Sequence, residues 1–214
     1  MNKNSAINYC PLCNNNSDIF FQHKKRLYHQ CKQCYGVFVD KDLIPNGQTE
    51  KSRYIQHIND IEDKRYQKFV LPITTAILRD FTQNDKGLDF GAGTGPVISK
   101  VLEDNHYSIE KYDPYFYNFP DLLKSKYDFI ACCEVIEHFN HPKKEFLLLK
   151  DLLKKNGRLY IMTSIYDESI NFKTWNYKDD DTHVFIYHKK TLQWIKEELG
   201  FAYMKIEGRL ITIS

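Results

Sequence analysis

The chain has 214 residues, with 30 basic and 28 acidic side chains and a formal net charge of +2. This length accommodates one full α/β domain and a small module, at roughly 150 residues per domain. The near balance of charge argues against nucleic acid as an overall partner, although it leaves room for a local basic patch. No apolar run approaches the roughly 20 residues that span a bilayer, and no signal core follows Met1, so we expect a soluble cytoplasmic protein with no membrane partner.

Four of the six cysteines form two Cys-x-x-Cys pairs near the N-terminus: Cys10 with Cys13, and Cys31 with Cys34. Two such turns supply four thiolates for the tetrahedral site that zinc prefers. A redox pair or disulfides are the alternatives, but they require an oxidising compartment or a thioredoxin-like context that the sequence does not indicate. We therefore predict a structural zinc site, which holds together a segment too short to bury an adequate core.

Residues 1–45 are predicted to form a zinc ribbon around these cysteines. Two apolar stretches on either side of the basic turn Lys24-Lys25-Arg26 indicate a β-hairpin, and Val37-Phe38-Val39 supplies a third strand. The basic turn is interpreted as a solvated loop, with contact to a phosphate backbone as the alternative. Turn-forming residues at 43–48 place the boundary with the second domain, residues 46–214.

The second domain begins with a segment whose apolar spacing predicts a helix up to Phe81. Asp60 can cap its N-terminus, and Pro72 is expected to kink or divide it. A cluster of polar residues unusual for a linker precedes the apolar pattern: Tyr54, His57, Asn59, Asp60 and Glu62. This cluster is either a solvated linker or part of a functional loop.

The run from Leu88 to Gly95, LDFGAGTG, joins a buried strand to an amphipathic helix that starts near Pro96. Glycine lets a ligand lie against bare backbone, and we expect Gly91 and Gly93 to make this approach. The spacing differs from the GxGxxG fingerprint of dinucleotide sites. Asp89 would repel a pyrophosphate but accept a hydrogen bond from an ammonium group, which favours a nucleotide that carries an amino acid over NAD.

This run resembles the first motif of the class I S-adenosylmethionine-dependent methyltransferases, which reads acidic-x-Gly-x-Gly-x-Gly. Three later segments resemble the same family in the same order: Tyr112-Asp113-Pro114, Tyr127 to Phe139, and Asn156 to Thr163. The resemblance covers residues 86–214. It implies an α/β fold with a Rossmann-like, doubly wound, mostly parallel sheet that ends in an antiparallel β-hairpin.

The resemblance also implies S-adenosylmethionine as the cofactor, held beyond the carboxyl ends of the strands. Asp113 is the implied ligand of the two ribose hydroxyls, and residues 46–85 are the implied helix and lid that fold over the cofactor. The other candidate cofactor contacts share this edge of the sheet: Asp89, Gly91, Ala92, Gly93, Gly95, Pro114, Cys133 and Glu134. Cys132 and Cys133 continue an apolar run, so we interpret them as a buried strand pair and not as nucleophiles.

The connection between Asp113 and Asp128 is too short for a helix, a strand and two loops. We therefore predict an abbreviated third crossover, which departs from the pattern of the family. The acid that contacts adenine in the family has no clear equivalent here, and Asp121 is the local candidate.

A long aromatic segment, residues 165–188, follows the fifth predicted strand, and we expect the acceptor to bind there. His183 is the first candidate for a general base and His138 the second, because imidazole takes up a proton near neutral pH. A structural role is the alternative for each histidine. The sequence shows no evident cluster of ligands for a catalytic metal.

Together these features predict a methyltransferase that acts on an O, N or C nucleophile of a small or medium-sized acceptor. The second hypothesis is an RNA methyltransferase whose zinc ribbon recognises the substrate, and the near-neutral charge counts against it. The third is a non-catalytic nucleotide-binding or scaffolding protein, which would bind the cofactor without turnover.

Overall fold

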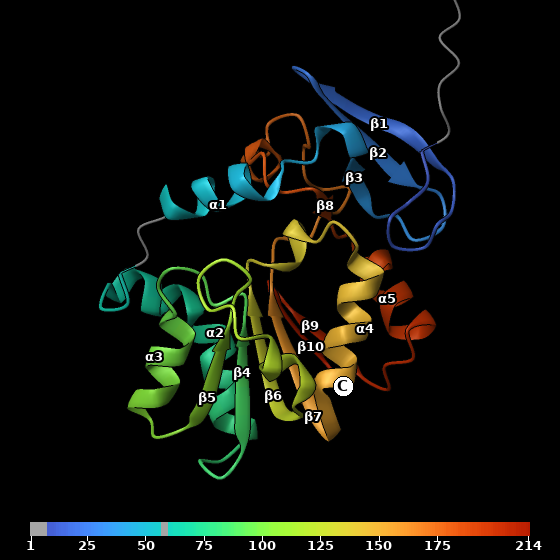
Figure 1. The fold of residues 1–214 in the computed structure, drawn as a ribbon. Helices are drawn as coiled ribbons and strands as arrows, with labels where there is room; N and C mark the ends of the chain where they lie inside the picture. Colours follow the sequence, from blue (N-terminus) through green and yellow to red (C-terminus); the bar gives the residue numbers. More distant parts are fainter. Residues whose placement is uncertain (1–7, 57–59) are drawn as a thin grey trace, which may run out of the picture.

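The computed structural model describes residues 8–56 and 60–214, so His57 and Asn59 of the predicted polar cluster lie outside the described residues. A six-stranded sheet with helices on both faces forms the larger part of the molecule, and a four-stranded sheet lies above one of its edges (Figure 1).

The six-stranded sheet has the mostly parallel topology that the sequence predicts. Its order is β5 (Ser108–Tyr112), β4 (Lys86–Phe90), β6 (Tyr127–Cys133), β7 (Leu153–Met162), β10 (Leu210–Ile213) and β9 (Met204–Glu207). The first four strands are parallel, whereas β10 runs antiparallel to both β7 and β9. The predicted terminal hairpin with one reversed strand is therefore confirmed.

Two helices cover each face of this sheet. Helices α2 (Lys64–Asp80) and α3 (Val97–Asp104) lie on one face, and α4 (Pro142–Leu152) and α5 (Lys189–Glu198) on the other (Figure 1). Successive side chains of a strand point to opposite faces. In β6, Phe129 and Ala131 accordingly pack with α2 and α3, whereas Ile130 and Cys132 pack with α4 and α5. The continuous apolar run of β6 reflects burial on both sides.

The third crossover is abbreviated, as predicted. Strand β5 is the edge of the sheet, and its connection to β6 contains only the short 3-10 helix η2 (Pro120–Lys124) as regular structure. Asp121 lies in η2 with its side chain 89% exposed and paired with Lys124. It is not among the residues that line the cavity described below, so the structure does not support it as an adenine contact.

The four-stranded sheet contains one strand more than the predicted ribbon. Its order is β1 (Ser17–His23), β2 (Arg26–Cys31), β3 (Val37–Val39) and β8 (Phe185–Ile186). Strand β8 belongs to the aromatic segment 165–188, which also holds the 3-10 helix η4 (Asn176–Asp179). The ribbon is thereby joined by backbone hydrogen bonds to the segment predicted to select the acceptor.

Two predicted features of helix α2 differ from the structure: its capping residue and its division at Pro72. Asp63 caps α2, with its carboxylate accepting a hydrogen bond from the Arg65 N–H at 2.8 Å, so the predicted cap at Asp60 is wrong. Helix α2 continues through Pro72, whose exposed position lets water hydrate the carbonyl that proline leaves unpaired. Helix α4 ends at Leu152, because Leu153 already pairs with Tyr127 in the sheet.

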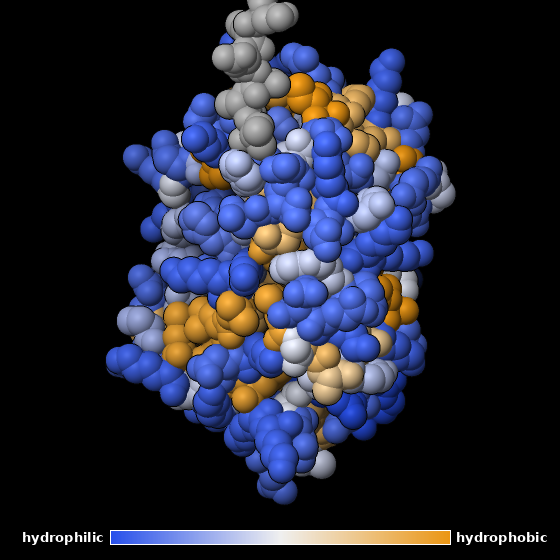
Figure 2. Space-filling model, turned by 90° about the vertical axis from the view of Figure 1, so that its right-hand side faces the viewer, coloured by the Kyte–Doolittle hydropathy of each residue, from blue (hydrophilic) through white to orange (hydrophobic). Residues whose placement is uncertain are grey.

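The surface seen from the right-hand side of Figure 1 is mostly hydrophilic, and apolar residues gather in limited areas (Figure 2). None of the helices in the described ranges is long and apolar enough to cross a membrane.

Candidate functional site

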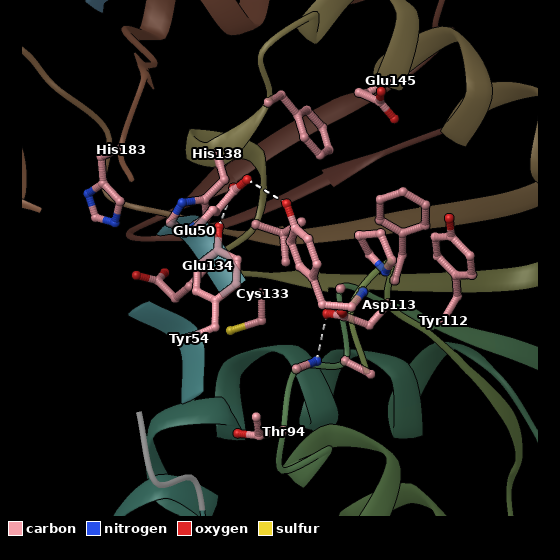
Figure 3. Close-up of a pocket in the computed structure, with 18 of the residues that line it drawn as sticks. Glu50, Tyr54, Thr94, Tyr112, Asp113, Cys133, Glu134, His138, Glu145 and His183 are labelled. Atoms are coloured by element: carbon pink, nitrogen blue, oxygen red, sulfur yellow. Dashed lines mark hydrogen bonds between the residues drawn. The ribbon is translucent and has the colours of Figure 1, made fainter. Parts of the chain in front are cut away.

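A cavity of about 700 Å³ lies beyond the carboxyl ends of the parallel strands, within the usual size range of small-molecule sites. Gly91 follows β4, Asp113 follows β5, and Cys133 ends β6. All three line the cavity, together with side chains from helix α1 (Gly47–Gln56) and from the aromatic segment (Figure 3). The fold thus brings candidate residues from distant parts of the chain to one edge of the sheet.

The glycine loop adopts a conformation that favours glycine. Gly91 and Gly93 have φ of 79° and 63°, in the left-handed region. A Cβ at Gly91 would lie 2.4 Å from a methyl group of Val135, whereas a Cβ at Gly93 would meet nothing within 4 Å. The N–H groups of Gly91 and Ala92 donate to the Tyr112 carbonyl at 2.8 and 3.2 Å, which fixes the loop against β5.

Asp113 is 6% exposed and joins the glycine loop to the turn after β5. Its Oδ2 accepts a hydrogen bond from Gly93 N–H at 3.0 Å (Figure 3). Its Oδ1 accepts from Tyr115 and Phe116 N–H at 2.8 and 3.1 Å. A carboxylate has about four acceptor positions, so Asp113 retains capacity for a ligand in the cavity. Pro114, beside it, also lines the cavity.

Asp89 and Gly95 are not among the cavity-lining residues. Asp89 is 4% exposed and accepts a hydrogen bond from Ser99 Oγ of α3 at 2.8 Å. Burial raises the pKa of its carboxyl to about 6. The side chain therefore links β4 to α3 beneath the loop, instead of facing a ligand as its motif position suggested.

Asp89→Asn is expected to stabilise the protein more at pH 8 than at pH 4. The pKa of Asp89 is higher in the folded state than the 3.8 of a free Asp, so the free energy of unfolding falls as pH rises between about 4 and 6. Asparagine avoids this loss, which amounts to at most about 3 kcal/mol, and it still accepts from Ser99. Urea denaturation at both pH values measures the effect; an equal difference at pH 4 and pH 8 would contradict it.

His138 and His183 lie side by side at one end of the cavity, with ring centroids 4.9 Å apart (Figure 3). Nδ1 of His138 lies 2.9 Å from the Thr182 carbonyl, and Nδ1 of His183 lies 2.7 Å from the Tyr177 carbonyl. A carbonyl only accepts, so each Nδ1 carries a proton and each Nε2 has a free lone pair in the neutral ring. Burial lowers the pKa of both, that of His183 to about 4, so both rings are neutral near pH 7.

Glu137 lies next to this pair and is 0% exposed. The Tyr177 hydroxyl donates to its Oε1 at 2.6 Å, and the Thr163 hydroxyl donates to its Oε2 at 3.1 Å. Burial raises the pKa of the Glu137 carboxyl. Neither Glu137 nor Tyr177 was predicted from the sequence as a catalytic residue, although Glu134, Glu137 and His138 directly after a buried strand were a usable signal.

Glu134 follows β6 with φ of 53°, an uncommon conformation for a residue with a side chain. Its carboxylate pairs with the guanidinium of Arg209, and burial followed by repulsion from Glu137 raises its pKa to about 7. Its neighbour Cys133 also lines the cavity, and burial raises the pKa of that thiol well above its ordinary value. A protonated thiol is a poor nucleophile, which agrees with the reading of Cys133 as a strand residue.

Helix α1 forms part of the cavity wall although none of its residues is buried. The Glu50 carboxylate accepts hydrogen bonds from the hydroxyls of Tyr54 and Tyr115 at 2.6 and 2.7 Å. Arg53 donates to Asp180 at 3.1 Å. The helix is therefore held over the cavity by polar contacts, which water can replace more readily than a packed apolar face.

The other end of the cavity is more apolar. Tyr112 and Glu145 lie there, away from His138 and His183 (Figure 3). Phe139 and Leu148 also line the cavity, and Glu145 belongs to α4. Glu145 is thus a carboxylate that the structure places at this end of the cavity. The sequence had offered Asp121 as the candidate acid for the adenine contact.

The four N-terminal cysteines lie together in the ribbon. The Cys10 and Cys34 sulfurs are 3.6 Å apart, those of Cys13 and Cys31 are 3.2 Å apart, and all four lie within 4.8 Å of one another. Sulfurs on one tetrahedral zinc ion, at about 2.3 Å from the metal, lie about 3.8 Å apart. The four thiols therefore fit the donor set of a closed zinc site.

Arg26 binds the ribbon to the aromatic segment, which corrects its interpretation as part of a solvated turn. Its side chain is 13% exposed. The guanidinium donates to four backbone carbonyls, those of Lys178, Asp180, Asp181 and His183, at 2.7 to 3.2 Å. The Tyr28 hydroxyl donates to the Lys178 carbonyl as well. The ribbon thus fixes the backbone that carries His183.

A family model described as a methyltransferase domain matches residues 62–206. No curated protein sequence matches the chain significantly. Three similar structures are 1,6-didemethyltoxoflavin-N1-methyltransferase of Burkholderia thailandensis (12% identity, TM-score 0.55), human N-acetylserotonin methyltransferase (11%, 0.53) and TnmH (13%, 0.50). The matches cover 92%, 78% and 71% of this chain, and 98%, 56% and 56% of those chains. The chain therefore spans little more than half of two of them.

Proposed function

The chain belongs to the methyltransferase domain family, and on this premise we propose that it transfers the methyl group of S-adenosylmethionine to a small or medium-sized acceptor. The observation that carries the proposal is the single cavity that extends from the glycine loop and Asp113 to His138 and His183. The human structure is described as a complex with SAM, and the Burkholderia structure contains S-adenosylhomocysteine and a small acceptor.

The residues around the cavity fit this cofactor. Asp113 is proposed to accept hydrogen bonds from the two ribose hydroxyls, because its carboxylate keeps free acceptor positions. Gly91, Ala92 and Gly93 are proposed to lie against the amino-acid part, where the open space next to Gly93 leaves room for a ligand. Glu134 is proposed to attract the ammonium group. Asp89 and Gly95 are proposed to act indirectly, by shaping the loop.

The adenine is proposed to lie at the apolar end of the cavity. Tyr112, Phe139 and Leu148 offer apolar surface there, and the Glu145 carboxylate can accept a hydrogen bond from an exocyclic amino group. This arrangement replaces the acid that a complete third crossover would carry.

When bound, S-adenosylmethionine supplies a methyl group on a positively charged sulfur. The protein then has to align an O, N or C nucleophile with this methyl group and remove a proton. The Nε2 lone pair of His183 is the first candidate to accept this proton, and that of His138 is the second. Burial keeps both rings neutral, so their Nε2 lone pairs are available, but the lowered pKa also makes each ring a weaker base than an ordinary imidazole.

Zinc is proposed to bind Cys10, Cys13, Cys31 and Cys34 as a structural ion, since four thiolates leave no open position on it. Residues 1–45 are proposed to be the ribbon, and residues 46–214 the methyltransferase domain with its lid at 46–85. Because Arg26 and β3 bind the aromatic segment 165–188, the ribbon is proposed to support the active site.

An RNA acceptor remains the second candidate, but the structure gives it less support. Arg26, one of three basic residues in the hairpin turn, is engaged with carbonyls of the same chain and is not free to bind phosphate. A purely binding or scaffolding function would leave the partly buried pair of neutral histidines without a role.

His183→Ala is expected to lower methyl transfer by at least about 100-fold while S-adenosylhomocysteine still binds, because the base is lost but the glycine loop and Asp113 are intact. Isothermal calorimetry measures binding, and release of S-adenosylhomocysteine measures turnover. His23→Ala, at the end of strand β1, is the control. Full turnover of His183→Ala would remove His183 from the mechanism.

A further inference from the structure

We propose that Glu137, His138 and His183 bind a divalent transition-metal ion at the end of the cavity where the two histidines lie. We propose further that this ion coordinates an oxygen nucleophile of the acceptor. The metal site is argued from the geometry of the three side chains. Its part in methyl transfer rests on the function proposed above.

The three side chains converge from two distant segments. One carboxylate oxygen of Glu137 and one ring nitrogen of each histidine lie within 4.8 Å of one another. Nitrogen and oxygen ligands lie about 2.0–2.2 Å from a zinc-like ion, so two ligands of one tetrahedral ion are about 3.4 Å apart. Side-chain rotations that shorten these separations by up to about 1.4 Å would therefore bring the three atoms into a coordination shell.

The three side chains make the kind of hydrogen bonds that orient metal ligands in other metal sites. A histidine ligand usually donates its second ring N–H to a carbonyl or carboxylate, which fixes the ring and its tautomer. Nδ1 of His138 and of His183 each meet a backbone carbonyl, so Nε2 is the nitrogen left for an ion. The Tyr177 and Thr163 hydroxyls orient the Glu137 carboxylate in the same manner.

The charge around Glu137 is also uncompensated. A buried carboxylate is costly unless a cation neutralises it. Within the part of the chain that the structure describes, no Lys or Arg forms an ion pair with Glu137, and the nearby Arg209 is paired with Glu134. A divalent ion between Glu137 and the two neutral imidazoles would supply the missing positive charge.

The donor set indicates which ions fit. Two imidazoles and one carboxylate suit Zn²⁺, Mn²⁺, Fe²⁺ or Co²⁺. Three protein ligands leave at least one position open, in contrast to the four cysteines of the ribbon. The open position is inferred to face the cavity, because His138 and His183 both line it, whereas the fully buried Glu137 does not.

An open metal position favours an oxygen acceptor. An amine that coordinates the ion would lose the lone pair needed for attack, whereas a coordinated hydroxyl becomes more acidic and keeps lone pairs after losing its proton. In the metal-loaded protein the Nε2 lone pairs of His138 and His183 are coordinated, so the ion takes over the role proposed above for His183 as the base. The hydroxyl proton passes to solvent, the oxygen forms a bond to the methyl carbon, and the carbon–sulfur electron pair stays on sulfur. We therefore infer an alcohol or phenol as the acceptor class.

The test is titration of the zinc-loaded full chain with Mn²⁺ and, separately, with Co²⁺. Free Mn²⁺ is measured by electron paramagnetic resonance, and bound Co²⁺ by its visible absorption. Mn²⁺ prefers oxygen and nitrogen ligands, so the thiolates of the ribbon do not compete for it. Wild type is expected to bind a single equivalent. Glu137→Gln, which keeps the shape but removes the charge, and His183→Ala are expected to bind at least about 10-fold more weakly, and His23→Ala like wild type.

Two results would overturn the metal site: no binding of either ion by wild type, or equal binding by Glu137→Gln. Calorimetry with S-adenosylhomocysteine on the same samples separates this proposal from the proposed function. Binding of S-adenosylhomocysteine without metal binding would refute the metal site alone. Metal binding without binding of S-adenosylhomocysteine would refute the proposed function alone. If the metal binds but amines are methylated in place of hydroxyl compounds, the inferred acceptor class is wrong.

Discussion

Replacing Asp113 by alanine is expected to weaken S-adenosylhomocysteine binding on the order of 100-fold or more. Hydrogen bonds to a charged group contribute about 1.5–3 kcal/mol each, and Asp113 is proposed to accept two from the ribose. The substitution also frees the N–H groups of Gly93, Tyr115 and Phe116, which loosens the glycine loop. Isothermal calorimetry measures the change in affinity.

Asp121→Ala is the matched control, because Asp121 is exposed and lies outside the cavity. Asp113→Asn gives a finer test: Oδ1 is kept for Tyr115 and Phe116, while an amide NH₂ opposes the Gly93 N–H. An intermediate loss is expected. Unchanged affinity of Asp113→Ala would refute the ribose contact.

Disconnecting the ribbon from the aromatic segment 165–188 is expected to abolish most turnover without preventing cofactor binding. Arg26→Ala removes the donor to four carbonyls of residues 178–183, so the backbone that positions His183 is released. We expect at least a 10-fold fall in kcat, an unchanged zinc content, and an affinity for S-adenosylhomocysteine within about twofold of wild type. Elemental analysis, calorimetry and steady-state kinetics measure the three quantities.

Lys25→Ala is the control for this effect, because Lys25 is an exposed neighbour in the same turn. Cys31→Ser, which removes one thiolate of the ribbon site and leaves Glu137, His138 and His183 intact, is expected to act in the same direction and more strongly, since metal binding supplies on the order of 10–16 kcal/mol in small zinc modules. Normal turnover of Cys31→Ser would show that the ribbon zinc is not needed to hold the site.

The sequence was sufficient for the parts of the fold that local patterns encode. The glycines after β4 and the acid after β5 mark strand ends, and parallel strands place those ends at one edge of a sheet. The short connection between Asp113 and Asp128 excluded a full third crossover, which the sheet order confirms. Asp113 and the glycine loop were therefore accessible to sequence reasoning.

Contacts between distant segments were not accessible in the same way. The pairing of β3 with β8 depends on two short strands that are far apart in the sequence, and neither carries a signal for the other. In the sequence Arg26 looks like any basic turn residue, and only the structure places the backbone carbonyls of residues 178–183 beside it. Glu145 likewise lines the cavity, where Asp121 does not, only because α4 borders it.

The cluster of Glu137, His138 and His183 shows a similar limit. Glu137 and His138 are adjacent in sequence, but His183 lies in an irregular segment whose course is set by its contacts with the ribbon. Metal ligands separated in this way have no fixed spacing, in contrast to the two Cys-x-x-Cys pairs of the ribbon. Their convergence could be found only in three dimensions.

The most direct test of the account is methyl transfer from S-adenosylmethionine labelled with tritium on its methyl group. The purified chain is incubated with the small-molecule fraction of an extract of its source cells, with and without nuclease treatment. We predict label in a small hydroxyl compound, unaffected by nuclease and absent with Asp113→Ala. Binding of the cofactor with no transfer to any fraction, or label that nuclease treatment removes, would contradict it.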